Sequence, residues 1–207
     1  MVAPMKKQQA HNRSVLSLSG NTASHLPRLL VVSSVSPLLV VIWCKYLTKV
    51  GQQPLLQFLR PLDDIERSPH FCLMVYMLIM AFSNWVPNFY MASHGMQFDN
   101  KHPRLAKAQL RGLPHRMVAA HNNAIEGLPN LLAGVFAASQ CDALDPYLEA
   151  ALCELVIFTR LLYMPAYYWG RYNAIRTILW ATGFFACVFL VFLTVYPDMA
   201  WLLGGTA

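Results

Sequence analysis

Four apolar stretches, each about as long as a membrane-spanning helix, follow one another along the second two thirds of the chain. They cover residues 71–91, 117–139, 147–169 and 174–196. A helix needs roughly 20 mainly apolar residues to cross the hydrocarbon layer of a bilayer. Backbone groups in lipid must be hydrogen-bonded internally, which a helix achieves. The pattern therefore predicts an all-α membrane protein with four membrane-spanning helices.

The charges of the connections predict the direction of each helix. The connection after the first stretch contains several basic residues and one acidic residue, Asp99. The connection after the second contains Asp142 and Asp145 and no basic residue, and the short third connection contains Arg171. Basic loops favour the cytoplasmic side of a membrane. We therefore expect the first and third connections inside, and the second connection and the C-terminus outside.

The N-terminal part of the chain has a different composition from the rest. The first 62 residues contain seven basic residues and no acidic one. Within them, Leu29 to Cys44 is apolar but only about 16 residues long, and it contains Pro37. Three interpretations stay open here: a fifth span or interfacial helix, a cleaved organelle leader, or disorder. The expected organisation is a basic extension over 1–69, a transmembrane domain over 70–196 and a short tail over 197–207.

The overall composition supports a membrane protein and excludes several other classes. Hydrophobic residues make up 56% of the chain and charged residues only 13%, against about a quarter charged in soluble proteins. From Asp63 onward the chain has nine basic and ten acidic residues. Because this part is nearly neutral, a nucleic-acid-binding surface is not expected. The five cysteines are scattered, with no CxxC pair, and the histidines lack metal-ligand spacing. We therefore predict no disulfide framework and no metal site.

The second apolar stretch has one polar face. At about 100° per residue, four of its side chains fall within an arc of about 80°: Arg116, Asn123, Glu126 and Asn130. An ionisable group in hydrocarbon costs at least roughly 2.5–3.5 kcal/mol, so this face must meet protein or water. Interhelical hydrogen bonding is one interpretation, but four polar residues on one stripe favour a binding site. His121 points elsewhere, and we expect it to be hydrogen-bonded or interfacial.

The third and fourth stretches contain arginines near the cytoplasmic side of the membrane, the side on which Arg116 is expected. Arg160, Tyr163 and Tyr167 share one helix face at i, i+3 and i+7, and Arg176 opens the fourth stretch. Guanidinium groups bind carboxylates bidentately, and a nearby positive charge favours a thiolate over a thiol. These residues and the polar face of the second stretch therefore predict a pocket in which an anionic thiol meets a lipophilic electrophile.

Two segments carry a resemblance to a known family. The first segment, at the start of the second stretch, is RMVAAHNNAIEGLP (residues 116–129). The second segment runs from within the third stretch into the fourth and is FTRLLYMPAYYWGRYNAIRTILWATG (residues 158–183). The first segment is similar to the start of the second helix in the MAPEG family (membrane-associated proteins in eicosanoid and glutathione metabolism), nearest to its bacterial-type branch. The second resembles the family's third-to-fourth helix signature. The resemblance extends over roughly residues 70–196.

The resemblance implies a four-helix transmembrane bundle that forms a homotrimer. We separately expect an integral multi-pass protein in an endomembrane or organelle membrane. The resemblance also implies a glutathione-dependent transferase or peroxidase that acts on lipophilic electrophiles or lipid hydroperoxides. In relatives that use glutathione, motif residues on helices two and three bind the tripeptide, and the arginine opening helix four stabilises the thiolate. The corresponding binding residues are Asn123, Glu126, Arg160, Tyr163 and Tyr167. The corresponding catalytic residue is Arg176.

Three positions depart from the family pattern. Ala119 stands where glutathione-binding relatives have an arginine, and Arg116, one turn earlier, is the candidate substitute. The arginine that they have near the end of helix one has no clear counterpart. Trp180 replaces a tyrosine used by some members. These departures keep open a non-catalytic membrane scaffold of the same fold that presents a lipid to a partner. A small transporter is a third alternative.

Overall fold

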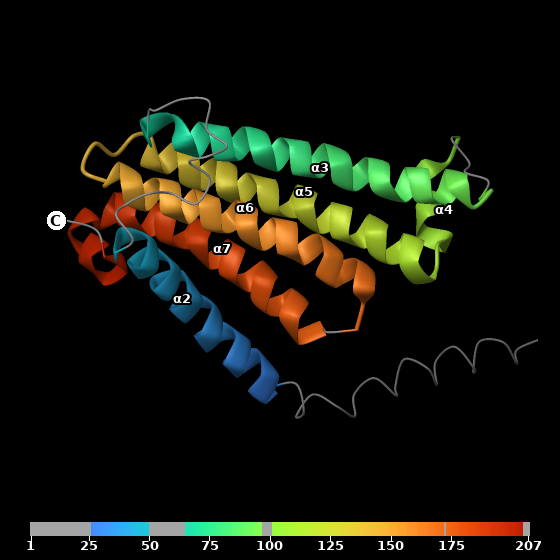
Figure 1. The fold of residues 1–207 in the computed structure, drawn as a ribbon, viewed down its shortest axis with the longest axis horizontal. Helices are drawn as coiled ribbons and strands as arrows, with labels where there is room; N and C mark the ends of the chain where they lie inside the picture. The colour runs from blue at the N-terminus through green and yellow to red at the C-terminus, as the bar shows by residue number, and fades with distance from the viewer. Residues whose placement is uncertain (1–25, 50–64, 97–100, 172, 205–207) are drawn as a thin grey trace, which may run out of the picture.

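The computed structural model describes residues 26–49, 65–96, 101–171 and 173–204. The long helices are α2 (Leu26–Lys49), α3 (Ser68–Ser93), α5 (Gly112–Ala138), α6 (Pro146–Trp169) and α7 (Asn173–Val195). Shorter elements are η4 (Ile65–Arg67), α4 (Pro103–Gln109) and η5 (Pro197–Leu203). No strand occurs among these residues, so the predicted all-α fold is confirmed (Figure 1). Residues 1–25 and 50–64 of the basic extension lie outside the described part of the chain.

Helices α3, α5, α6 and α7 run side by side and alternate in direction. Figure 1 shows α4 and the α6–α7 turn at one end of this bundle, and the α5–α6 connection and η5 at the other. The two connections predicted to be cytoplasmic therefore lie at the same end. The core between the helices is formed by fully buried side chains, among them Tyr76, Leu131, Leu152 and Leu190.

Local sequence signals set the two ends of α6. At its start, the Asp145 carboxylate accepts a hydrogen bond from the Tyr147 backbone N–H at 2.9 Å, and Pro146 occupies the first turn, where it needs no hydrogen-bond partner. At its end, Gly170 adopts a left-handed conformation with φ 69°, which glycine tolerates without steric cost. The chain therefore turns within a few residues, and α7 begins next to the C-terminal end of α6.

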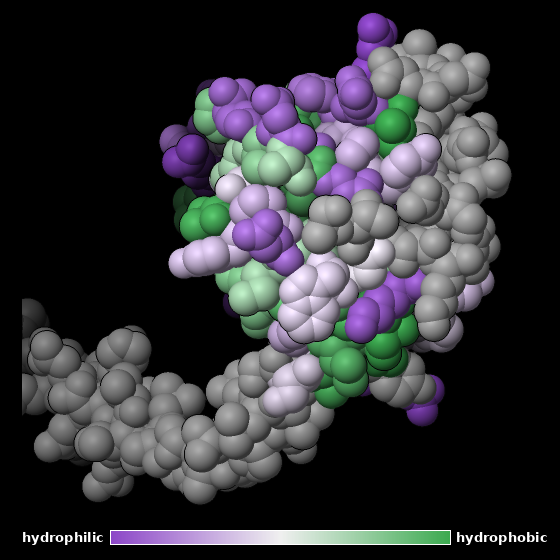
Figure 2. Space-filling view, turned by 90° about the vertical axis from the view of Figure 1, so that its left-hand side faces the viewer, coloured by the Kyte–Doolittle hydropathy of each residue, from purple (hydrophilic) through white to green (hydrophobic). Residues whose placement is uncertain are grey.

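The surface of the bundle suits a bilayer. By length and composition, two helical segments could span a membrane: η4 with α3 (Ile65–Ser93), and α7. Large apolar side chains are exposed along the bundle, including Phe89 at 72% and Phe136 at 67%. Figure 2 views the end with the α5–α6 connection, where hydrophilic residues gather, and exposed Gln140 and Asp142 belong to this connection. An apolar side with a polar end is the arrangement that a membrane requires.

Helix α2 packs against α6 and α7. It runs in the same direction as α7 (Figure 1). The Trp43 indole N–H donates a hydrogen bond to the Ala151 carbonyl at 3.1 Å, and its ring stacks on Phe158 with centroids 5.2 Å apart. Residues 26–49 are thus helical. The choice among a fifth span or interfacial helix, a cleaved leader and disorder stays a prediction.

Candidate functional site

The Arg160 side chain lies where α3, α5 and α6 meet. Only 4% of the residue is exposed. Its Nη1 donates to the Asn123 carbonyl of α5 at 3.4 Å, and its Cζ lies 5.9 Å from the Tyr76 ring centroid and 5.7 Å from that of Tyr163. The Tyr76 hydroxyl in turn donates to the Ala124 carbonyl at 2.9 Å. Arg160 is therefore positioned by one aromatic ring from α3 and another from its own helix.

Gly127 makes room for this arginine. A Cβ atom at Gly127 would lie 2.8 Å from Arg160 Cζ, and it would collide with Arg160 Nη2 and the Tyr76 hydroxyl. Even alanine would therefore displace the guanidinium or the ring. The glycine directly after Glu126 is required by the close approach of α5 to these two side chains.

A row of rings and charges continues from Arg160 to the start of α7. The rings of Tyr163 and Tyr167 lie 5.4 Å apart between centroids, and Arg176 Cζ lies 4.2 Å from the Tyr167 centroid. Both contacts are within the range of aromatic and cation–π attraction. We name this row, Arg160–Tyr163–Tyr167–Arg176, the polar ladder. Trp180, one turn beyond Arg176, stacks on Phe184 with centroids 5.5 Å apart.

Both ends of the polar ladder carry buried hydrogen-bond donors that lack a partner. Within the described part of the chain, the Nε atoms of Arg160 and Arg176 are buried and make no hydrogen bond. Leaving a buried donor unsatisfied costs about 1–3 kcal/mol, and more when the group is charged. A carboxylate is the acceptor that suits a guanidinium best. The ladder thus has an unused guanidinium donor at each end.

The polar face of α5 is only partly covered by the other helices. Glu126 is exposed, yet it interacts electrostatically with Tyr163 of the ladder. Asn130 lines a pocket of about 360 Å³ between α5 and α7, and the Asn123 amide donates back to the Ala119 carbonyl at 3.0 Å. A carboxylate on a membrane helix cannot face hydrocarbon cheaply. Glu126 therefore needs protein or water beyond the described helices as its surroundings.

Arg116 has a different role from the other predicted residues. Its Nε donates to the Tyr168 carbonyl at 3.0 Å, and its side chain packs against Gly170, where an added Cβ would lie 2.8 Å from Nε. Arg116 therefore joins the start of α5 to the C-terminus of α6, where a cation is also favoured by the helix dipole. Its contribution to ligand binding stays a prediction.

Sequence reasoning missed two residues of this region, Tyr76 and Gly127. Tyr76 occurs in an apolar stretch and has no polar neighbour in sequence, so no local pattern indicates its contact with Arg160. Gly127 could have been noticed as a small residue on the polar helix, directly after Glu126. His121 is hydrogen-bonded as expected, because its Nδ1 lies 2.9 Å from the Ser83 hydroxyl.

Comparison with known proteins identifies the family. The model of the MAPEG family matches residues 69–196, a range that contains all of α3 except its first residue, the whole of α4 to α7, and the polar ladder. No curated protein and no solved structure matched the chain. The matched range covers more than half of the sequence, and the described helices form the all-α membrane bundle expected of such a protein. The chain is a member of the MAPEG family.

Proposed function

We propose that this protein is a membrane-embedded, glutathione-dependent transferase or peroxidase that acts on lipophilic electrophiles or lipid hydroperoxides. The observation that carries the proposal is the polar ladder, with a buried, unpartnered guanidinium nitrogen at each end. Membership of a family of glutathione-related membrane proteins supports the same class of activity.

The chemistry of the described residues fits glutathione. At neutral pH the tripeptide has two carboxylates, one ammonium group and a thiol. Arg160 and Arg176 supply donors for carboxylate or thiolate, and the exposed Glu126 supplies a partner for the ammonium group. Asn123 and Tyr167 are half-buried and Tyr163 is buried where α5 and α6 meet, and all three supply hydrogen-bonding groups.

Arg176 is the proposed catalytic residue. Its positive charge stabilises the glutathione thiolate relative to the thiol, because a nearby cation favours the anionic form. In the transferase reaction, sulfur bonds to the electrophilic carbon and the leaving group departs. In the peroxidase reaction, two glutathione molecules reduce the hydroperoxide to an alcohol and water and form glutathione disulfide. Tyr167 holds the guanidinium by ring contact at 4.2 Å.

We also propose that the working unit is a homotrimer with its sites between subunits. The exposed Glu126 on the polar face of α5 supports this assembly, because a neighbouring subunit would remove the carboxylate from hydrocarbon. The pocket lined by Asn130 opens on the same face. The lipophilic substrate would reach such a site directly from the bilayer, in an endomembrane or organelle membrane.

An activity assay with a matched pair of arginine variants tests the proposal. Purified protein in detergent is assayed for conjugation of glutathione to a chloronitrobenzene and for reduction of a fatty acid hydroperoxide. Arg176→Ala should lower the turnover number about 10²–10³-fold if it removes one stabiliser of the developing charge. Arg171→Ala, in the exposed turn before α7, should leave the turnover number unchanged. Absence of both activities in the folded wild-type protein would favour the lipid-presenting scaffold instead.

A further inference from the structure

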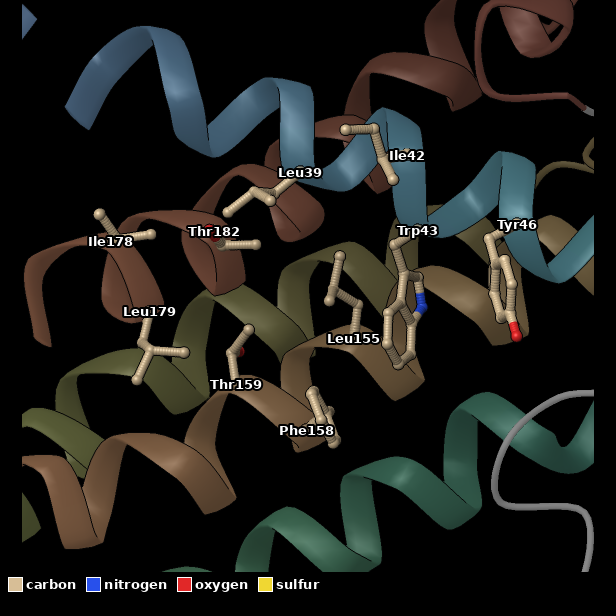
Figure 3. A pocket seen from close by; sticks show the side chains of 10 residues that line it. All are labelled: Leu39, Ile42, Trp43, Tyr46, Leu155, Phe158, Thr159, Ile178, Leu179 and Thr182. Atoms are coloured by element: carbon tan, nitrogen blue, oxygen red, sulfur yellow. The ribbon is translucent and has the colours of Figure 1, made fainter. Parts of the chain in front are cut away.

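A second, almost wholly apolar pocket lies between α2, α6 and α7, away from the polar ladder. Its volume is about 260 Å³. Figure 3 shows side chains from the three helices around it. Those from α2 are Leu39, Ile42, Trp43 and Tyr46, those from α6 are Leu155, Phe158 and Thr159, and those from α7 are Ile178, Leu179 and Thr182.

The pocket depends on a helix outside the matched family range. That range begins at residue 69, whereas α2 supplies four of the lining side chains. Trp43 fixes α2 there through its hydrogen bond to Ala151 at 3.1 Å and its stacking on Phe158. The family's bundle alone would leave this face of α6 and α7 without the wall that α2 provides.

The pocket extends along α2 and is lined by uncharged side chains. Its α2 wall runs from Leu39 to Tyr46, a distance of about 10 Å along a helix at about 1.5 Å per residue. The lining contains no charged residue. The α2 side chains Leu39 and Ile42 are 38% and 54% exposed, so the pocket opens on the outside of the bundle.

We propose that this pocket binds one acyl chain of a membrane phospholipid, which fastens α2 to the bundle. The pocket is bounded by α7, which is long and apolar enough to span the bilayer, so the fluid outside its mouth is hydrocarbon. An apolar cavity does not hold water stably, and a polar ligand would lose its hydration without gaining charged partners. An acyl chain fills the space without this cost. Because the chain comes from hydrocarbon and not from water, its binding rests on packing contacts.

The Thr182 hydroxyl distinguishes the binding of an acyl chain from the binding of a polar ligand. Its Oγ1 is buried and has no hydrogen-bond partner within the described residues, and the residue is 3% exposed. A ligand with an oxygen or nitrogen acceptor would use this donor, whereas an acyl chain cannot. Thr182→Val, which keeps the shape and removes the hydroxyl, should therefore leave acyl-chain binding intact or strengthen it.

Native mass spectrometry of the full chain tests the proposal without glutathione. The protein is stripped of lipid by detergent exchange, supplied with phosphatidylcholine and examined for bound lipid. The wild type and Thr182→Val should each retain one lipid per chain. Leu39→Trp, which fills the pocket, should lose it, while Leu38→Trp, at the neighbouring exposed position that does not line the pocket, should retain it.

A second readout covers the case in which Leu39→Trp does not fold. Phosphatidylcholine with a brominated acyl chain should quench the fluorescence of Trp43 in the wild type at saturable, low lipid ratios, and Trp43→Phe should lack this saturable component. Equal lipid retention by Leu39→Trp and Leu38→Trp, loss of lipid in Thr182→Val, or the absence of saturable quenching would each overturn the proposal. None of these outcomes depends on whether the polar ladder binds glutathione.

Discussion

The guanidinium of Arg160 lies against the ring of Tyr76, with Cζ 5.9 Å from the ring centroid, although the two residues belong to different helices. The same tyrosine donates a hydrogen bond from its hydroxyl to the Ala124 carbonyl at 2.9 Å. Tyr76 therefore connects α3 to α5 and at the same time positions a predicted ligand-binding arginine of α6. Helix α3 contributes to the site through a residue that binds no ligand in the proposed reaction.

Two substitutions at Tyr76 separate its hydroxyl from its ring. Tyr76→Phe should lower the free energy of unfolding by about 1 kcal/mol, because one hydrogen bond is lost. Tyr76→Leu should lower it by about 2–5 kcal/mol, because a cavity forms and the cation–π contact with Arg160 disappears. Thermal unfolding in detergent measures both effects. Equal destabilisation by the two variants would show that the ring does not support Arg160.

Gly127→Ala should disturb Arg160 more than a comparable change elsewhere on α5. The new Cβ would lie 2.8 Å from Arg160 Cζ, and overpacking of this kind costs about 1–3 kcal/mol. Gly134→Ala is the matched control, because its Cβ would lie 3.0 Å from the flexible end of Leu190, far from the ladder. Binding of glutathione should weaken in the first variant and stay unchanged in the second. A titration in which Gly127→Ala binds glutathione as tightly as the wild type would contradict the role given to Arg160.

Tyr167 should act on Arg176 mainly through its ring. Tyr167→Phe keeps the contact that places Arg176 Cζ 4.2 Å from the ring centroid, whereas Tyr167→Leu removes it. A cation–π contact contributes about 0.5–2 kcal/mol, which corresponds to a roughly 2- to 30-fold loss of catalytic efficiency in the leucine variant. The phenylalanine variant should lose less, and steady-state kinetics with glutathione varied will measure both. If both variants lose activity equally, the hydroxyl is the group that matters.

Arg116→Ala should affect stability more than ligand binding. The substitution removes the hydrogen bond from Nε to the Tyr168 carbonyl at 3.0 Å and the packing against Gly170. A hydrogen bond from a charged group contributes about 1.5–3 kcal/mol, so the unfolding temperature should fall. The dissociation constant of glutathione, measured below that temperature, should change less than in Arg176→Ala. The opposite ranking of the two variants would make Arg116 a ligand-binding residue.

The helices could be predicted closely from the sequence. The apolar stretches at 71–91, 117–139, 147–169 and 174–196 correspond to α3, α5, α6 and α7 within a few residues at each end. Helix length in a membrane is set by bilayer thickness and by the need to satisfy the backbone, and both leave a signal in local sequence. The end of α6 differs least, because Gly170 has the left-handed conformation that ends a helix.

The site was less predictable, because its contacts join helices that are distant in sequence. Residue spacing groups Arg160, Tyr163 and Tyr167 on one face, and they do form a row. Spacing alone could not reveal that Tyr76 packs against Arg160. Residue spacing also could not show that Arg116 donates a hydrogen bond to the Tyr168 carbonyl. The spacing places a side chain on one face of its helix but does not say which residue of another helix it contacts.

Glutathione binding can be measured directly by calorimetric titration of the detergent-solubilised protein, with Arg176→Ala and Glu126→Ala measured beside the wild type. Buried, unpartnered Arg176 Nε and exposed Glu126 should both contribute, so the wild type should bind saturably and each variant should bind more weakly. A well-folded oligomer that gives no binding heat at millimolar glutathione, or variants that bind as tightly as the wild type, would contradict the account.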